Sequence, residues 1–178
     1  YNVERTTAGA TEILNFDEAF GPFAGETYDN EPGVENTITW TNIIVTIVWA
    51  GGGTTNWGTG TNWVGGVAPD STQEAYIPNG STPYPVVTNT RLARGVTIES
   101  GVTLTVSATD TLRMRRSVNN SGYMVMGATS VLRVGGDYIN AGLLTPNTST
   151  VILDGTIDQS VSAGGSASGK PLYDLVIN

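Results

Sequence analysis

Short runs of alternating apolar and polar residues recur every twenty residues in the C-terminal half of the chain. Leu112, Leu132 and Ile152 share one position of this repeat, and Val131 aligns with Val151. A fixed short period is typical of solenoids, in which each coil buries its apolar face against its neighbours. We therefore predict coils of two or three short strands, with Leu112, Leu132 and Ile152 as an internal aliphatic ladder.

Polar residues recur in the same register, which favours a solenoid over a β-sandwich with evenly spaced strands. Asn120 aligns with Asn140, and we expect the two side chains to form an amide ladder at a turn. Glycine recurs at Gly122 and Gly142 and again at Gly135 and Gly155. At these four positions we predict a backbone with positive φ, which glycine adopts readily.

The strongest single strand signal precedes the repeats, in the run TITWTNIIVTIVW over residues 37–49. β-branched residues dominate it, and it is apolar on both faces, so we expect it to be buried on both sides or to lie at an interface. Two interpretations remain open: it caps the solenoid core, or it pairs with a neighbouring subunit. The candidate assembly residues are Ile38, Trp40, Ile43, Ile44, Val45, Ile47 and Val48.

A glycine-dense loop over residues 50–70 holds Trp57 and Trp63, each preceded by Asn. One interpretation is that the tryptophans anchor this loop over the end of the solenoid, because such a loop needs buried contacts to become ordered. The alternative is an exposed aromatic platform for sugar rings, formed by Trp57, Trp63 and Tyr76.

Residues 1–36 contain eight of the sixteen acidic residues, together with Gly-Pro and Pro-Gly pairs. This composition indicates an extended arm or loop. We therefore divide the chain into residues 1–48, an acidic arm with the hydrophobic strand, and residues 49–178, the solenoid domain. The predicted fold class is all-β: a right-handed parallel β-solenoid with an N-terminal extended arm and a Trp/Gly-rich cap.

The composition disfavours several classes of partner and several kinds of chemistry. The net charge of −8 disfavours nucleic acid as a partner, and the longest apolar run is too short for a transmembrane helix. The absence of His and Cys removes the commonest general base, the commonest metal ligand and thiolate chemistry. A low charged fraction of 13% with many hydroxyl and amide side chains is typical of extracellular β-proteins.

No motif for catalysis is present, so we expect no enzyme activity and no cofactor. A β-helical polysaccharide lyase or hydrolase is disfavoured because no paired acids stand out. Ca²⁺, which takes oxygen ligands, is the one metal worth considering. Its candidate ligands are Asp154 with Asp158, or Asp70 with Glu74.

A wider pattern resembles a known family. Trp49-Ala-Gly, Trp57, Asn62-Trp63, Gly66 and Pro69 lead into VTIESGVTLTV, LRVGGDYINAGLL and the closing PLYDLVIN. This order is similar to a module of large secreted surface proteins from Bacteroidetes-type bacteria, and the similarity covers about residues 48–178. It implies a β-solenoid stalk or adhesin piece at the cell surface. Such modules usually continue past the closing strand, which implies a fragment or an open end here.

The leading functional hypothesis is therefore an extracellular, non-enzymatic structural or adhesive module. It would associate with itself through the N-terminal strand and the open solenoid end, as part of a filament, stalk or layer. The alternative is a carbohydrate-binding module, with a surface polysaccharide as partner.

Overall fold

The computed structural model describes residues 2–7, 10–15, 44–163 and 172–178, and the chain divides into two compact units, Tyr1–Ile43 and Ile44–Asn178. In the first unit, β1 (Asn2–Thr7) and β2 (Ala10–Asn15) form an antiparallel hairpin. The boundary lies earlier than the predicted one at residue 48. The reason is that β3 (Thr46–Val48) pairs with the solenoid strand β4 and so belongs to the second unit.

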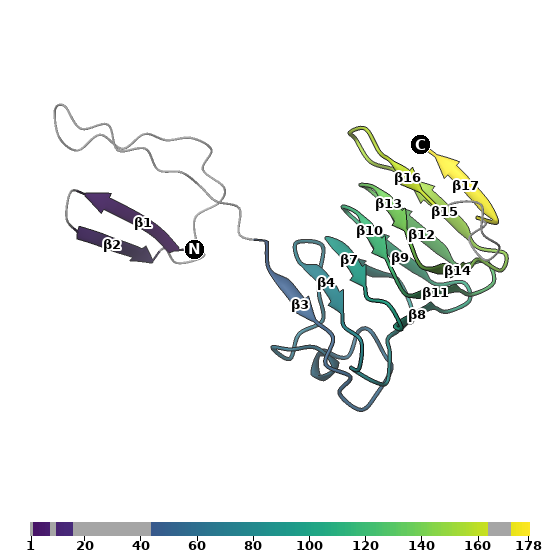
Figure 1. Cartoon of the computed structure of the whole chain (residues 1–178), viewed down its shortest axis with the longest axis horizontal. Helices are drawn as coiled ribbons and strands as arrows, with labels where there is room; N and C mark the ends of the chain where they lie inside the picture. The colour runs from purple at the N-terminus through teal and green to yellow at the C-terminus, as the bar shows by residue number, and fades with distance from the viewer. Residues whose placement is uncertain (1, 8–9, 16–43, 164–171) are drawn as a thin grey trace. The chain divides into compact units, whose positions relative to one another are not determined.

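The second unit is a parallel β-solenoid of about five turns, built from three sheets (Figure 1). The first sheet contains β3, β4 (Glu74–Ile77), β7 (Gly95–Ile98), β10 (Val118–Asn120), β13 (Tyr138–Asn140) and β16 (Val161–Ser162). The second contains β5 (Val86–Val87), β8 (Thr103–Val106), β11 (Tyr123–Met126) and β14 (Leu143–Thr145). The third contains β6 (Arg91–Ala93), β9 (Thr111–Met114), β12 (Val131–Val134), β15 (Thr150–Leu153) and β17 (Asp174–Ile177).

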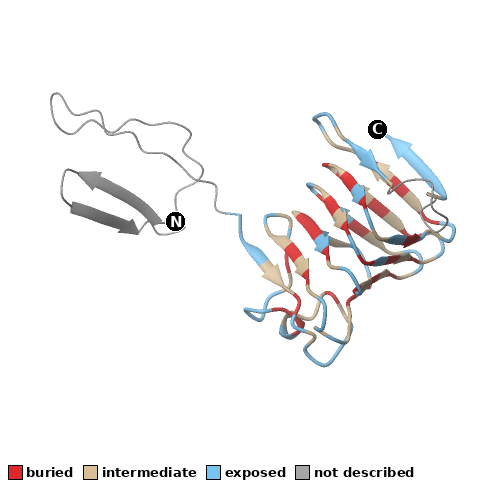
Figure 2. Cartoon of the chain, viewed as in Figure 1, coloured by how far each residue is buried: buried red, intermediate tan, exposed pale blue. Residues whose placement is uncertain are grey.

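The four coils from β4 to β15 each visit the three sheets in order, so the predicted two or three strands per coil are three in this part of the stack. Residues alternate between buried and more exposed along most central strands, as the bands in Figure 2 show. The inward positions are almost all aliphatic, and they form one continuous core that runs the length of the stack. This alternation follows from the two-residue period of a strand, one face of which meets the core.

The predicted aliphatic ladder exists, but its last member was assigned wrongly. Leu132 pairs with Leu112 on one side and with Val151, not Ile152, on the other. Ile152 instead lies opposite Arg133, on the outward face. The corner between β14 and β15 is one residue shorter than the equivalent corner between β11 and β12 in the previous coil. The strict twenty-residue register therefore ends there.

The Asn ladder is confirmed. Asn120 and Asn140 are both buried, and Asn120 Nδ2 donates to Asn140 Oδ1 at 2.8 Å. The same Nδ2 donates to the Leu143 carbonyl at 3.0 Å, and Asn120 Oδ1 accepts the Gly122 N–H at 3.0 Å. The amide thus closes the corner between the first and second sheets.

The predicted positive φ at the repeated glycines is wrong. None of Gly122, Gly135, Gly142 and Gly155 is among the glycines with positive φ. They are needed for close approach instead: a Cβ on Gly142, for example, would overlap the Gly122 carbonyl oxygen of the coil below. Positive φ at residues other than glycine occurs at the corner between the second and third sheets, at Asn89, Thr109, Thr129 and Asn147. Between the first and second sheets, Gly80 and Gly101 of the earlier coils have positive φ.

The glycine-dense segment forms the predicted cap at the first coil. Trp49, Trp57 and Trp63 are buried, and the Trp63 ring makes edge contacts with both others at centroid distances of 4.9 and 4.8 Å. Trp63 Nε1 donates to the Trp57 carbonyl at 2.7 Å. Between the last two tryptophans, a single 3₁₀ turn, η1 (Gly60–Asn62), places Asn62 in the interior, where it bonds back to the loop.

Candidate functional site

In the described part of the chain, the ion pairs form two separate groups. Asp154 accepts from Arg133 at 2.8 Å and lies 3.6 Å from Arg113, one coil further down. Glu74 pairs with Arg94 at 3.1 Å. These contacts engage one member of each proposed Ca²⁺ pair, and no group of three or more metal-ligating side chains is found in the described ranges. The described part of the chain therefore offers no built metal centre.

The aromatic platform does not exist as the sequence suggested. Trp57 and Trp63 are inside the cap, so neither ring has a free face for a sugar. Only Tyr76 reaches the outer surface of the first sheet, where its hydroxyl donates to Glu99. This hydrogen bond raises the pKa of Tyr76 and lowers the pKa of Glu99, whose other oxygen accepts the Asn79 N–H at 2.9 Å.

The predicted assembly strand is only partly free. Ile38, Trp40 and Ile43 lie outside the described residues. Ile47 packs against the core, and Val48 is half-buried. The Val48 carbonyl accepts the Val64 N–H of the cap at 2.8 Å, so the cap covers part of the outer edge of β3. Ile44 and Val45 remain 48% and 45% exposed, so the expectation of burial on both sides fails for these two residues.

At the opposite end of the stack, the described residues of the last coil are exposed. Leu175 and Ile177 pair with Val151 and Leu153, whose side chains face the core, so both are inward positions of the last coil. They are nevertheless 39% and 77% exposed, and β17 is exposed along its whole length in Figure 2. Val161, the counterpart of the buried Tyr138 in β16, is exposed in the same way.

Exposed hydrophobic residues of the described chain concentrate at the two ends of the solenoid. Fourteen large hydrophobic side chains are exposed, and only Leu92, Tyr123, Ile139 and Leu143 lie on the flanks. At the first coil and its cap the exposed residues are Ile44, Val45, Val64 and Val67. At the last coil they are Ile157, Val161, Tyr173, Leu175, Val176 and Ile177. Exposed apolar side chains that gather in one region can mark an interaction site, so the two ends are candidate contact surfaces.

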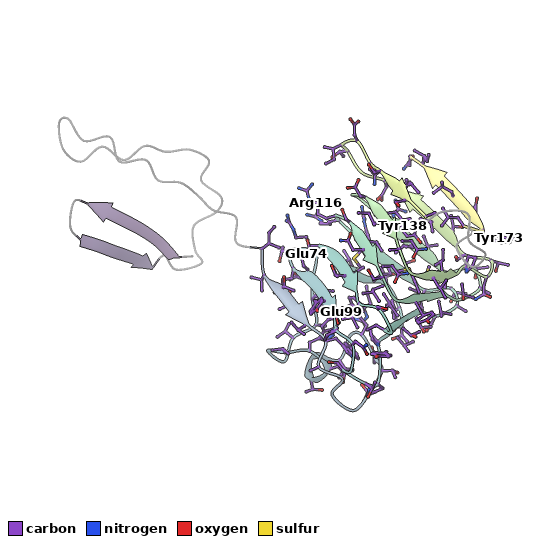
Figure 3. The ribbon with its side chains drawn as sticks, in the orientation of Figure 1. Glu74, Glu99, Arg116, Tyr138 and Tyr173 are labelled. Carbon is purple, nitrogen blue, oxygen red and sulfur yellow. The ribbon has the colours of Figure 1, made fainter. Side chains whose placement is uncertain are left out.

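The last complete coil also contains buried polar atoms without a partner. The Tyr138 hydroxyl, Asn140 Nδ2 and Ser149 Oγ are all buried and unbonded in the described structure. Burial raises the pKa of Tyr138 to about 12. Figure 3 shows Tyr138 and Tyr173 toward this end, and Glu74, Glu99 and Arg116 in the earlier coils. Sequence reasoning missed these atoms, although a Tyr aligned with Val118 in an aliphatic column is a readable signal.

A scan of the described residues finds no helix of the length and hydropathy that a membrane span requires. Neither a curated protein nor a solved structure gives a significant match to the chain. A family model does: the domain of unknown function DUF8693 matches residues 48–153, which run from the end of β3 through the cap to the end of β15. This match covers more than half of the sequence, and the chain therefore belongs to the DUF8693 family.

Proposed function

We propose that this protein is an extracellular structural or adhesive module whose solenoid associates end to end with further copies of itself. The concentration of exposed hydrophobic residues at the two ends of the coil stack is the observation that supports it. The low charge and the resemblance to secreted surface modules support a location outside the cell.

The last coil has the geometry of a stacking surface. Its strands continue the first and third sheets in parallel register, and its inward side chains stand where the next coil would cover them. Ile44, Val45, Val64 and Val67 at the capped end provide an apolar counterpart. A contact between two different ends is heterologous, and a heterologous contact that does not close into a ring produces a filament.

The expected association is weak for one interface. The partly exposed inward side chains of the last coil, Val161, Leu175 and Ile177, would each contribute on the order of 1 kcal/mol on burial, against the cost of immobilising two chains. The assembly should therefore grow with protein concentration. Many contacts along a filament would stabilise it beyond the affinity of one pair.

Sedimentation velocity over a concentration series, combined with negative-stain microscopy, tests the proposal on the 178-residue chain. We expect larger species at high concentration. Ile177→Asp and Leu175→Asp should return the protein to the monomer, because a carboxylate at the contact would be buried without a partner. Leu92→Asp is the matched control, since Leu92 is 41% exposed on the flank and Leu175 is 39% exposed at the end.

Two outcomes would reject end-to-end association. One is a protein that stays monomeric at every concentration. The other is an assembly that Leu92→Asp disrupts as strongly as Leu175→Asp, which would place the contact on the side of the coils.

A further inference from the structure

The outer face of the first sheet contains a shallow polar hollow of about 450 Å³. Its lining includes Glu74 and Tyr76 of β4, Thr97 of β7, Asn119 of β10 and Arg116 just before β10. The hollow lies on the side of the coils and also reaches Thr46 of β3, the residue after Val45. It is separate from the last coil, at the other end of the stack.

The register of the strands explains why the surface is hollow here. Tyr76, Thr97 and Asn119 lie in one row across three coils, at the strand spacing of about 4.8 Å. In the parallel row, Glu74 lies opposite Gly95. A Cβ on Gly95 would overlap the Glu74 carboxylate and approach the Ser117 carbonyl oxygen to 2.9 Å. The absence of a side chain at Gly95 therefore makes room for the Glu74 carboxylate at the edge of the hollow.

The side chains around the hollow offer a mixed and largely uncommitted set of hydrogen-bonding groups. The Tyr76 ring is held by its bond to Glu99, so it presents a fixed aromatic surface. The carboxylate of Glu74 is already paired with Arg94. In the described structure Arg116 makes no ion pair, and the side chains of Thr97 and Asn119 have no hydrogen bond, so their donors and acceptors face solvent.

The balance of positive and negative side chains around the hollow favours a neutral ligand. Two carboxylates, Glu74 and Glu99, lie beside two guanidinium groups, Arg94 and Arg116, so the local charge balances on a chain of net charge −8. A phosphate or polyanion gains little at such a site, because the negative field of the whole chain opposes it. A neutral ligand rich in hydroxyl groups matches an aromatic face bordered by hydroxyl, amide and guanidinium groups.

We propose that this hollow binds a neutral oligosaccharide, with a sugar ring against Tyr76 and its hydroxyl groups bonded to Thr97, Asn119 and Arg116. Binding of this kind on an open surface is weak, in the millimolar to high micromolar range. It would give the coil stack an adhesive side in addition to its stacking ends.

Saturation-transfer NMR followed by titration calorimetry on the full chain tests this inference. The probes are neutral cello-, xylo-, manno-, malto- and chito-oligosaccharides, with inorganic phosphate and oligogalacturonate as anionic comparisons. We expect at least one neutral series to bind. Asn119→Ala and Arg116→Ala should each weaken it about 5- to 10-fold, the loss of roughly one hydrogen bond.

A matched pair of threonines separates the hollow from a general surface effect. Thr97→Ala removes a hydroxyl from the hollow, whereas Thr105→Ala removes one from β8 of the second sheet, outside it. Binding should fall with the first variant and stay unchanged with the second. The inference fails if no neutral oligosaccharide binds, if only the anionic probes bind, or if Thr97→Ala and Asn119→Ala bind as the wild type does. Repeating the titration on Ile177→Asp keeps the result distinct from self-association.

Discussion

The two asparagines of the amide ladder occupy equivalent positions, yet the structure predicts very different costs for their removal. Asn120→Ala leaves three groups without their partner: the Gly122 N–H, Asn140 Oδ1 and the Leu143 carbonyl. At roughly 1–2 kcal/mol for each unsatisfied group, the free energy of unfolding should fall by about 3–5 kcal/mol.

Asn140→Ala should cost far less. It removes one hydrogen bond, and Asn120 Nδ2 keeps its second bond to the Leu143 carbonyl. It also removes Asn140 Nδ2, a buried donor without a partner. These two effects oppose each other, so the net loss should be about 1 kcal/mol. Both variants delete the same atoms from buried sites, so the cavity cost largely cancels in the comparison.

Equilibrium unfolding in urea measures the difference. With a slope of about 2 kcal/mol per molar urea, the midpoints of the two variants should lie about 1–2 M apart. Tryptophan fluorescence follows the cap and far-UV circular dichroism follows the coils, so the two signals reveal whether the stack unfolds as a unit. Asn119→Ala, in the same strand as Asn120 but half-exposed, is the control and should change little. Equal losses for Asn120→Ala and Asn140→Ala would refute the hydrogen-bond reasoning.

Three further predictions follow from single residues. Tyr138→Phe should stabilise the protein by about 1 kcal/mol at pH 7, because it removes a buried hydroxyl without a partner. Since burial raises the pKa of Tyr138 from 10.0 to about 12, the wild type should also lose stability as pH rises from about 10 to 12, and the variant should lose less. Urea unfolding at pH 7 and pH 11 measures both effects. A steeper loss of stability in the variant would contradict the assignment. Thr129→Asn should stabilise the protein by about 1 kcal/mol, because φ is 57° at Thr129 and Asn tolerates this conformation better than a β-branched residue. A thermal melt should show a higher melting temperature for the variant. A lower melting temperature would argue against strain at this corner. Trp63→Ala should lower the free energy of unfolding by about 4 kcal/mol and abolish the near-UV circular dichroism of the cap. It removes two ring contacts and the hydrogen bond to the Trp57 carbonyl. Val64 is 57% exposed, so the control Val64→Ala should leave the stability and the near-UV signal unchanged.

The sequence predicted the parts of the fold that depend on repeated identity. Asn120 and Asn140 could be matched from their spacing alone, and so could the step from Leu112 to Leu132. The step from Leu132 to Val151 could not be predicted, because a corner can be one residue shorter while the strands on either side of it stay the same. Only the pairing of Leu132 with Val151 reveals that loss.

Glycine was harder to interpret than asparagine. A recurrent glycine can serve a left-handed backbone or a close approach, and the two readings look the same in a sequence. At Gly142 the explanation is close approach, because a Cβ there would overlap the Gly122 carbonyl oxygen of the neighbouring coil. The left-handed corner was hidden because Thr109 and Thr129, β-branched residues that disfavour this conformation, occupy it beside Asn89 and Asn147.

The candidate surfaces depended on contacts that no local pattern contains. Trp57 and Trp63 suit both a buried anchor and an exposed platform, and only the packed cap distinguishes them. The hollow beside Tyr76 arises where three coils place their side chains in one row, so its members are spread along the chain from Glu74 to Asn119.

The closed cap at the first coil has a consequence for how the solenoid forms during synthesis. Trp49, Trp57 and Trp63 leave the ribosome before any repeat does, so a sealed end with ordered strand edges can exist while later coils are still being made. Each new coil then needs only to pair with the preceding one, about twenty residues back, which keeps the cost of loop closure small and constant. The coils can therefore be added one by one in the direction of translation, with the cap as the template that sets the register of all the others.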